Sequence, residues 1–155
     1  MKRRALPALW LLILVWLALP SLAQETNLSD GRTLGIGMEV EYPWGGLVGV
    51  RYWLSPAWAL EEVAFASGDL QGLSGTLTTR LLCRVADTAG TDFYVAAGAT
   101  ARFSPYGGEP ATLSVVGGVE FAFSRAFAWN VEFGASVTTT GSVDMAIGTG
   151  IHYYF

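Results

Sequence analysis

The residues of this chain that could do chemistry are charged side chains at alternating positions within apolar segments. Successive side chains of an extended strand point to opposite faces, so the charges of one segment share a face. Arginine and carboxylate groups gathered on one face can form a salt-bridge network, a proton relay or the lining of a pore. The set comprises Glu39, Glu41, Arg51, Glu61, Arg80, Arg84, Arg102, Glu120, Glu132 and Asp144, together with the sole histidine, His152.

His152 is the residue whose side chain could serve as a general base near neutral pH. A base activates a nucleophile only within hydrogen-bond reach, and residues 143–155 around His152 contain no serine. We expect Ser114 and Ser136 to lie near the opposite rim of the fold from His152. The pattern therefore predicts no catalytic site.

Other sequence features give no support for a cofactor. The glycines of residues 31–37 and 148–150 lie in strand-like segments with no helix after them, so they cannot form a phosphate-binding loop. Cys83 is the only cysteine, which excludes an intramolecular disulfide and does not support a cysteine-based metal site. We predict no cofactor and no metal.

Eight segments alternate with a period of two, which predicts β-strands. We expect strands at about residues 33–42, 47–54, 58–66, 73–85, 92–103, 113–123, 127–137 and 143–155. The third is irregular because Glu61 and Glu62 are adjacent; a β-bulge there would keep Glu61 on the polar face and return Val63 and Phe65 to the apolar face. Eight strands with short connections predict an all-β, antiparallel up-and-down transmembrane β-barrel.

The start of the chain has the layout of a secretory signal. Three basic residues precede an apolar run and then Ser21-Leu22-Ala23, which predicts a cleavable signal peptide at residues 1–23. We expect a flexible tail at residues 24–32 and the barrel at residues 33–155. After residue 23 the bases are all arginine, and thirteen acids oppose them, which argues against a nucleic-acid-binding protein.

The two faces of the strands differ in bulk as well as in charge. The apolar face is large, whereas the charged face is rich in glycine and alanine, which suits a crowded lumen. Aromatic residues gather at both sets of strand ends, as in the girdles of membrane barrels. One girdle comprises Tyr52, Trp53, Trp58, Phe93, Phe121, Phe123, Phe127 and Trp129, and the other comprises Tyr42, Trp44 and Phe103. A soluble lipocalin-like carrier with the opposite orientation of faces is the alternative.

The last segment places Ile151, Tyr153 and Phe155 at alternating positions. This pattern resembles the assembly signal in the final strand of bacterial outer-membrane barrels, and residues 33–155 resemble the small OmpA/OmpX-type barrels as a class. The resemblance implies the bacterial outer membrane, a periplasmic tail, and contact with membrane lipids, the barrel-assembly machinery and periplasmic chaperones. It also implies external loops at residues 43–46, 67–72, 104–111 and 138–142.

These observations favour a mainly structural role, with the lumen plugged by paired arginines and acids. A surplus of acids in the lumen leaves a small cation-preferring channel as an alternative. The loop at residues 104–111 leaves a surface-contact or adhesion role as a second alternative. Some barrels of this class modify lipids, but His152 lacks a nearby nucleophile, so a lipid-modifying enzyme is less favoured. The sequence identifies no external ligand.

Overall fold

A computed structural model describes residues 32–43, 45–69, 72–107 and 111–155. The predicted signal peptide, the tail as far as residue 31, and Trp44 lie outside these residues. The strands are β1 (Leu34–Tyr42), β2 (Val48–Trp53), β3 (Trp58–Asp69), β4 (Gly72–Thr88), β5 (Thr91–Phe103), β6 (Thr112–Ala122), β7 (Phe127–Thr138) and β8 (Val143–Tyr154). No helix among these residues is long and apolar enough to cross a membrane.

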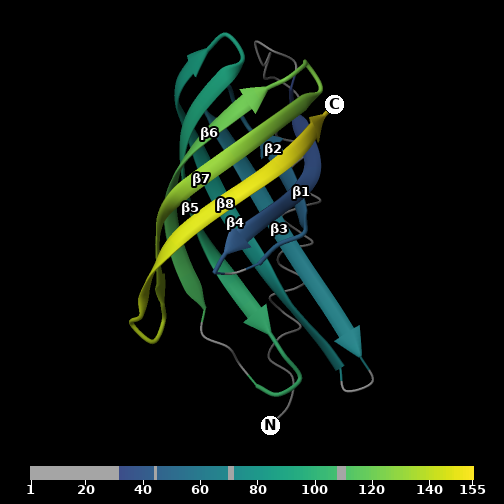
Figure 1. The fold of residues 1–155 in the computed structure, drawn as a ribbon, viewed down its shortest axis with the longest axis vertical. Coiled ribbons are helices and arrows are strands. Elements are labelled where there is room, and N and C mark those ends of the chain that lie inside the picture. Colours follow the sequence, from purple (N-terminus) through teal and green to yellow (C-terminus); the bar gives the residue numbers. More distant parts are fainter. Residues whose placement is uncertain (1–31, 44, 70–71, 108–110) are drawn as a thin grey trace.

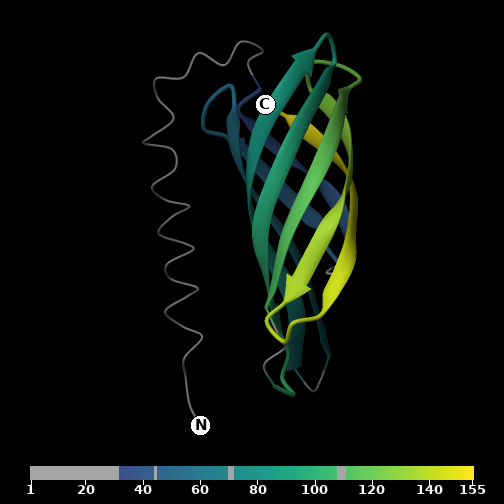
Figure 2. The ribbon, with the colours of Figure 1, turned by 90° about the vertical axis from the view of Figure 1, so that its left-hand side faces the viewer.

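The eight strands form a closed antiparallel barrel in which each strand pairs with its neighbour in sequence. β1 and β8 close the barrel over a register that runs from Gly35 opposite Tyr154 to Tyr42 opposite Ile147. Figures 1 and 2 show a tall, narrow barrel with tilted strands. The predicted fold class, an eight-stranded antiparallel up-and-down barrel, is confirmed.

We call the end at which β8 finishes the C-terminal rim, and the other end the loop rim (Figure 1). Serine side chains close two tight turns at the C-terminal rim. Ser55 Oγ accepts a hydrogen bond from the Trp58 amide at 3.1 Å, and Ser124 Oγ accepts one from the Phe127 amide at 3.0 Å. A serine that accepts a nearby backbone N–H stabilises a reversal of the chain, so β2 and β6 lead directly into β3 and β7.

The third strand is regular, so the predicted bulge at Glu61 and Glu62 is wrong. Glu61 pairs with Arg80 and Glu62 with Thr79 without a break in register. Glu61 therefore points inward and Glu62 outward, where the Thr79 hydroxyl donates to the Glu62 carboxylate at 2.8–2.9 Å. Val63, expected on the apolar face, points inward and is 0% exposed. The register shift lies instead in β4, between Arg84 and Ala86 opposite β5.

The β3–β4 hairpin is longer than predicted, because pairing continues beyond the expected strand ends. Ser67 pairs with Ser74 and Asp69 with Gly72, so much of the expected loop at residues 67–72 belongs to the two strands. At the other end of β4, Thr88 still pairs with Thr91. In Figure 1 the arrow of β3 consequently ends lower at the loop rim than the arrow of β5.

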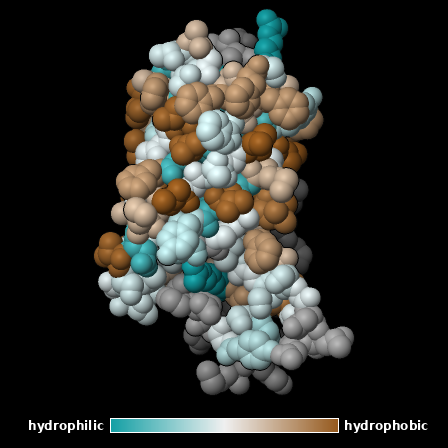
Figure 3. Space-filling model, in the orientation of Figure 1, coloured by the Kyte–Doolittle hydropathy of each residue, from teal (hydrophilic) through white to brown (hydrophobic). Residues whose placement is uncertain are grey.

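The barrel buries polar side chains and exposes apolar ones. Its interior contains glutamate, arginine, asparagine and threonine side chains, whereas valine, leucine, isoleucine, methionine and phenylalanine cover the outer wall. Apolar residues extend over the wall of the barrel that faces the viewer in Figure 3. Small residues make room inside: a Cβ at Gly118 would lie 2.3 Å from the Tyr94 ring, so the tyrosine fits only beside glycine.

Candidate functional site

Arg80 of β4 is the centre of the interior charge cluster, and its side chain is 1% exposed. Its guanidinium lies 2.6 Å from a carboxylate oxygen of Glu39, 2.6 Å from one of Glu41 and 2.5 Å from one of Glu132. It also forms an ion pair with Glu61. Four carboxylates from β1, β3 and β7 thus converge on one cation, which offsets part of the desolvation cost of burying them.

Arg51 of β2 is the second buried cation. Its Nε donates to Glu61 Oε1 at 2.7 Å, and its Nη1 donates to Glu120. Because Glu61 also binds Arg80, its two oxygens join the two arginines into one network. Arg51 lies over the Tyr94 ring, 5.2 Å from the centroid, which adds a cation–π contact.

Neutral hydrogen-bond donors complete the network. The Tyr94 hydroxyl donates to Glu132 at 2.5 Å, and the Tyr154 hydroxyl donates to Glu120 at 2.9 Å. Asn130 Nδ2 donates to the Tyr94 hydroxyl at 3.1 Å and to Glu39 at 3.3 Å. The sequence reasoning did not assign these three residues to the network, although their positions on the charged face of alternating strands were the signal for it.

A second ion-pair group lies near the C-terminal rim. Arg84 pairs with Asp92 at 3.0 Å, and Arg32 reaches Asp92 at 3.7 Å and Glu120 at 3.6 Å. Neither Arg32 nor Asp92 was predicted to take part. Trp53 was predicted for the outer aromatic girdle, but it is 2% exposed and lies inside, with the Arg84 guanidinium 4.1 Å from the centroid of its ring. The alternation of side chains along β2 explains the inward position of Trp53, because Arg51 and Trp53 are two residues apart and so share a face.

The remaining two residues of the predicted network lie near the loop rim. Arg102 donates to the backbone carbonyl of Pro43 at 2.8 Å. Asp144 is exposed at the start of β8, outside the buried cluster. The network is therefore concentrated in the middle and the C-terminal half of the lumen.

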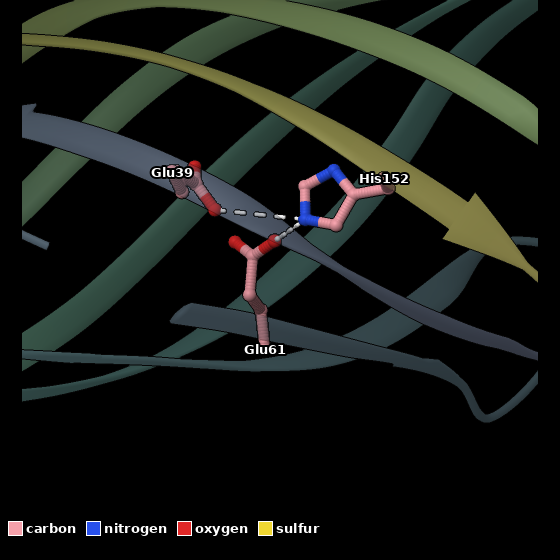
Figure 4. A group of neighbouring side chains, drawn as sticks. All are labelled: Glu39, Glu61 and His152. Carbon is pink, nitrogen blue, oxygen red and sulfur yellow. Dashed lines mark ion pairs between the residues drawn. The ribbon is translucent and has the colours of Figure 1, made fainter. Parts of the chain in front are cut away.

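His152 of β8 lies inside the barrel beside two carboxylates (Figure 4). Its Nε2 is 3.5 Å from Glu61 Oε1 and 3.7 Å from Glu39 Oε2. Neither ring nitrogen has a hydrogen-bond partner among the residues that the structure describes. No serine, threonine or cysteine in that part of the chain donates to the imidazole, so the geometry supplies no activated nucleophile.

The outer wall carries the remaining predicted aromatic residues. At the C-terminal rim, Phe121 stacks on Trp129 at 5.6 Å between ring centroids, and Phe127 meets Tyr153 edge to face at 5.0 Å. The predicted girdle residues that are exposed or half-exposed are Tyr42, Tyr52, Trp58, Phe93, Phe103, Phe121, Phe123, Phe127 and Trp129. Tyr42 and Phe103 lie at the loop rim.

The predicted assembly-signal residues Ile151, Tyr153 and Phe155 are exposed and alternate with buried residues. The Phe155 amide donates to the carbonyl of Leu34 at 2.9 Å, so the end of β8 is attached to the start of β1. The Tyr153 and Phe155 rings lie 4.9 Å apart, edge to face. The three side chains form one continuous apolar patch at the seam of the barrel.

Among the strand side chains that the structure describes, that of Glu62 is the only charged one that faces outward. It is 9% exposed, because neighbouring outer side chains and the Thr79 hydroxyl cover its carboxylate. A carboxylate in an apolar belt is costly unless it is hydrogen-bonded. The Thr79 hydroxyl supplies that bond.

Comparison with known proteins identifies the fold. No protein-family model matches the chain, and no curated protein matches it in sequence. Among solved structures, the chain is similar to the N-terminal β-barrel domain of OprF from Pseudomonas aeruginosa, with a TM-score of 0.58 and 12% sequence identity. The similarity covers 79% of this chain and 95% of that domain. The chain has the fold of the small eight-stranded barrels. This finding confirms the OmpA/OmpX-type architecture predicted from the alternating strands.

Two groups of buried side chains bring together enough potential metal-ligand atoms to consider a cation. One comprises Glu39, Glu41 and Glu132, and the other comprises Glu39, Glu61 and His152. In the first group the Arg80 guanidinium already contacts all three carboxylates within 2.6 Å and so supplies the positive charge. In the second group Arg80 contacts Glu39 and Glu61, and Arg51 Nε donates to Glu61 Oε1. The imidazole of this group, however, has no hydrogen-bond partner among the described residues.

Proposed function

We propose that this protein is an integral β-barrel of the bacterial outer membrane with a mainly structural role. The observation that carries the proposal is the inverted distribution of side chains, with a fully buried charge network inside and an uncovered apolar wall outside. In water, such an apolar surface would be unfavourable. In a bilayer the same wall meets hydrocarbon, and the closed hydrogen-bonded sheet leaves no unpaired strand edge.

The aromatic residues at both rims support a membrane location. Tyrosine and tryptophan combine an apolar ring with a polar group, which suits the boundary between lipid and water, and phenylalanine adds apolar rings beside them. Tyr42 and Phe103 lie at the loop rim, and Phe121 and Trp129 lie at the C-terminal rim. We infer that the apolar patch of Ile151, Tyr153 and Phe155 is presented to the barrel-assembly machinery during insertion, and that periplasmic chaperones cover it before insertion.

The proposed structural role is inferred from the charged side chains that fill the lumen. Arg51, Arg80, Glu39 and Glu61 are at most 1% exposed, and they tie β1, β2, β3 and β4 together across the interior. We infer that side chains packed in this way block the passage of hydrated ions. We therefore favour a plugged lumen over a channel. We favour a structural role over a catalytic one because no serine, threonine or cysteine of the described residues donates to His152.

Cell fractionation combined with heat-modifiable gel migration tests the membrane assignment. The protein should partition with outer membranes, and unheated samples should migrate differently from boiled ones because the barrel resists the detergent. Recovery of a folded protein in buffer without detergent would contradict the proposal and favour a lipocalin-like carrier. Discrete cation-selective current steps of the purified protein in planar bilayers would contradict the plugged lumen.

A surface-contact role is a second candidate, and one feature of the loop rim favours it. A small pocket there lies between the β3–β4 hairpin and the segment after β5, and it is lined by Ser67, Gly68, Gly72, Ser74, Pro105 and Tyr106. The pocket offers hydroxyl groups and an exposed aromatic ring. Replacement of residues 104–111 with a short glycine-serine loop should preserve membrane insertion; a concurrent loss of cell adhesion would support this role.

A further inference from the structure

The group formed by His152, Glu39 and Glu61 has the geometry of a metal-ligand set. The Nε2 atom of His152 lies 3.5 Å from Glu61 Oε1 and 3.7 Å from Glu39 Oε2, and the three ligand atoms all lie within 4.8 Å of one another. Ligand atoms about 2.0–2.2 Å from a tetrahedral zinc ion are about 3.3–3.6 Å apart. Shifts of a few tenths of an ångström would bring the two pairs that include the imidazole to that separation.

The surrounding residues orient one carboxylate oxygen towards the imidazole. Arg80 Nη2 and Asn130 Nδ2 both donate to Glu39 Oε1, at 2.6 and 3.3 Å. Glu39 Oε2 is left without a hydrogen-bond partner among the described residues, and it is the oxygen that faces His152 Nε2 (Figure 4). Second-shell donors of this kind hold metal-binding carboxylates in place.

The residue of β2 beside these two atoms is Gly49, which has no side chain of its own to place against them. A Cβ at Gly49 would lie 3.2 Å from Glu39 Oε2 and 3.4 Å from His152 Nε2. A methyl group there would be tight against Glu39 Oε2 and would touch His152 Nε2, the two atoms that lack partners among the described residues. Glycine at this position keeps open the volume next to them.

The charge balance of the lumen favours a bound cation. The described arginine–carboxylate ion pairs of the interior involve four arginines, Arg32, Arg51, Arg80 and Arg84. They involve six carboxylates, Glu39, Glu41, Glu61, Asp92, Glu120 and Glu132. Among these described ion pairs the carboxylates outnumber the arginines, and uncompensated negative charge is costly inside a closed barrel. A divalent cation would reduce this cost, and Glu120 and Glu132 offset the repulsion from Arg51 and Arg80.

We propose that His152, Glu39 and Glu61 bind a divalent first-row transition-metal ion inside the barrel. One imidazole and two carboxylates form a mixed nitrogen–oxygen set that suits Zn²⁺ better than Mg²⁺ or Ca²⁺, which take oxygen ligands. The ion would bind during folding, because the ligands are fully buried once the barrel has closed. It would join β1, β3 and β8, and so reinforce the seam between the first and last strands.

The test uses the full protein purified from cells, unfolded in urea with a chelator, and refolded in detergent with Zn²⁺, with Co²⁺ or with no metal. Wild type should retain about one Zn²⁺ per barrel after desalting, and the Co²⁺ form should show visible ligand-field absorption. The metal should raise the urea midpoint for loss of the heat-modifiable band. His152→Ala should weaken metal retention at least about tenfold.

Two further variants separate this site from non-specific binding. Gly49→Ala fills the adjacent volume and should weaken retention while all three ligands remain. Glu41→Gln removes a carboxylate of the other buried group and should retain the metal. Equal retention by wild type and His152→Ala would overturn the proposal, as would a folded wild-type barrel with no bound metal. Heat-modifiable migration of each variant shows whether it has folded. A metal-free result would leave the proposed membrane role standing.

Discussion

Glu61 of β3 and Arg80 of β4 lie directly opposite each other in the wall of the barrel, and their side chains form an ion pair inside the lumen. This ion pair is part of the larger interior network, because Glu61 also accepts a hydrogen bond from Arg51, and Arg80 also contacts three further carboxylates. Removal of either partner would therefore leave several buried charges without compensation.

Arg80→Ala should destabilise the barrel by about 3–5 kcal/mol, because it leaves buried carboxylates without their cation. Urea unfolding in detergent micelles, followed by heat-modifiable migration, measures the change. Arg125→Ala is the matched control; Arg125 lies exposed in the turn between β6 and β7, so its removal should cost less than about 0.5 kcal/mol. Equal unfolding midpoints for Arg80→Ala and wild type would show that the network contributes nothing to stability.

Gly118→Ala should destabilise the barrel by about 1–3 kcal/mol, because the added Cβ would lie 2.3 Å from the Tyr94 ring and force the tyrosine away from Glu132. The neighbouring residue provides the control. A Cβ at Gly117 would point outward with its nearest contact at 4.0 Å, so Gly117→Ala should leave stability within about 0.5 kcal/mol. If Gly117→Ala destabilised the barrel more than Gly118→Ala, the assignment of the inward and outward faces of β6 would be wrong.

Phe155→Ala should reduce the yield of barrel in the outer membrane, because it removes part of the patch that we propose for recognition during assembly. Quantitative immunoblots of outer-membrane fractions measure the yield. Phe123→Ala removes another exposed aromatic at the same rim and should have a smaller effect. If both variants reach wild-type yield, the patch has no special part in assembly.

The alternation of side chains made most of the fold predictable. A period of two identified all eight strands and the inner faces of all but the third, because closure of a membrane barrel puts charged side chains in the lumen and bulky apolar ones on the wall. For the same reason, the alternation of side chains along β2 was sufficient to place Trp53 inside, beside Arg51. The aromatic character of Trp53 wrongly suggested an outer girdle position.

The remaining features of the fold and of the charge network depended on contacts between strands, which the sequence alone does not show. Glu62 was expected to need a bulge because a carboxylate on an apolar face is costly, but its partner Thr79 belongs to another strand. Asp92 and Arg32 meet only because the barrel closes. Which acids surround Arg80 likewise depends on register and on the stagger of strands distant in sequence, and a single sequence does not specify these.

Fluorescence quenching by lipids with brominated acyl chains tests the central claim most directly, using two single-tryptophan variants in which the other tryptophans are replaced by phenylalanine. Trp129 lies on the outer wall of β7, and Trp53 lies inside beneath Arg84. In bilayers of the brominated lipid, Trp129 should be strongly quenched and Trp53 should keep nearly all of its emission. Equal quenching of the two tryptophans, or quenching of neither, would contradict a membrane barrel with an apolar wall and a charged interior.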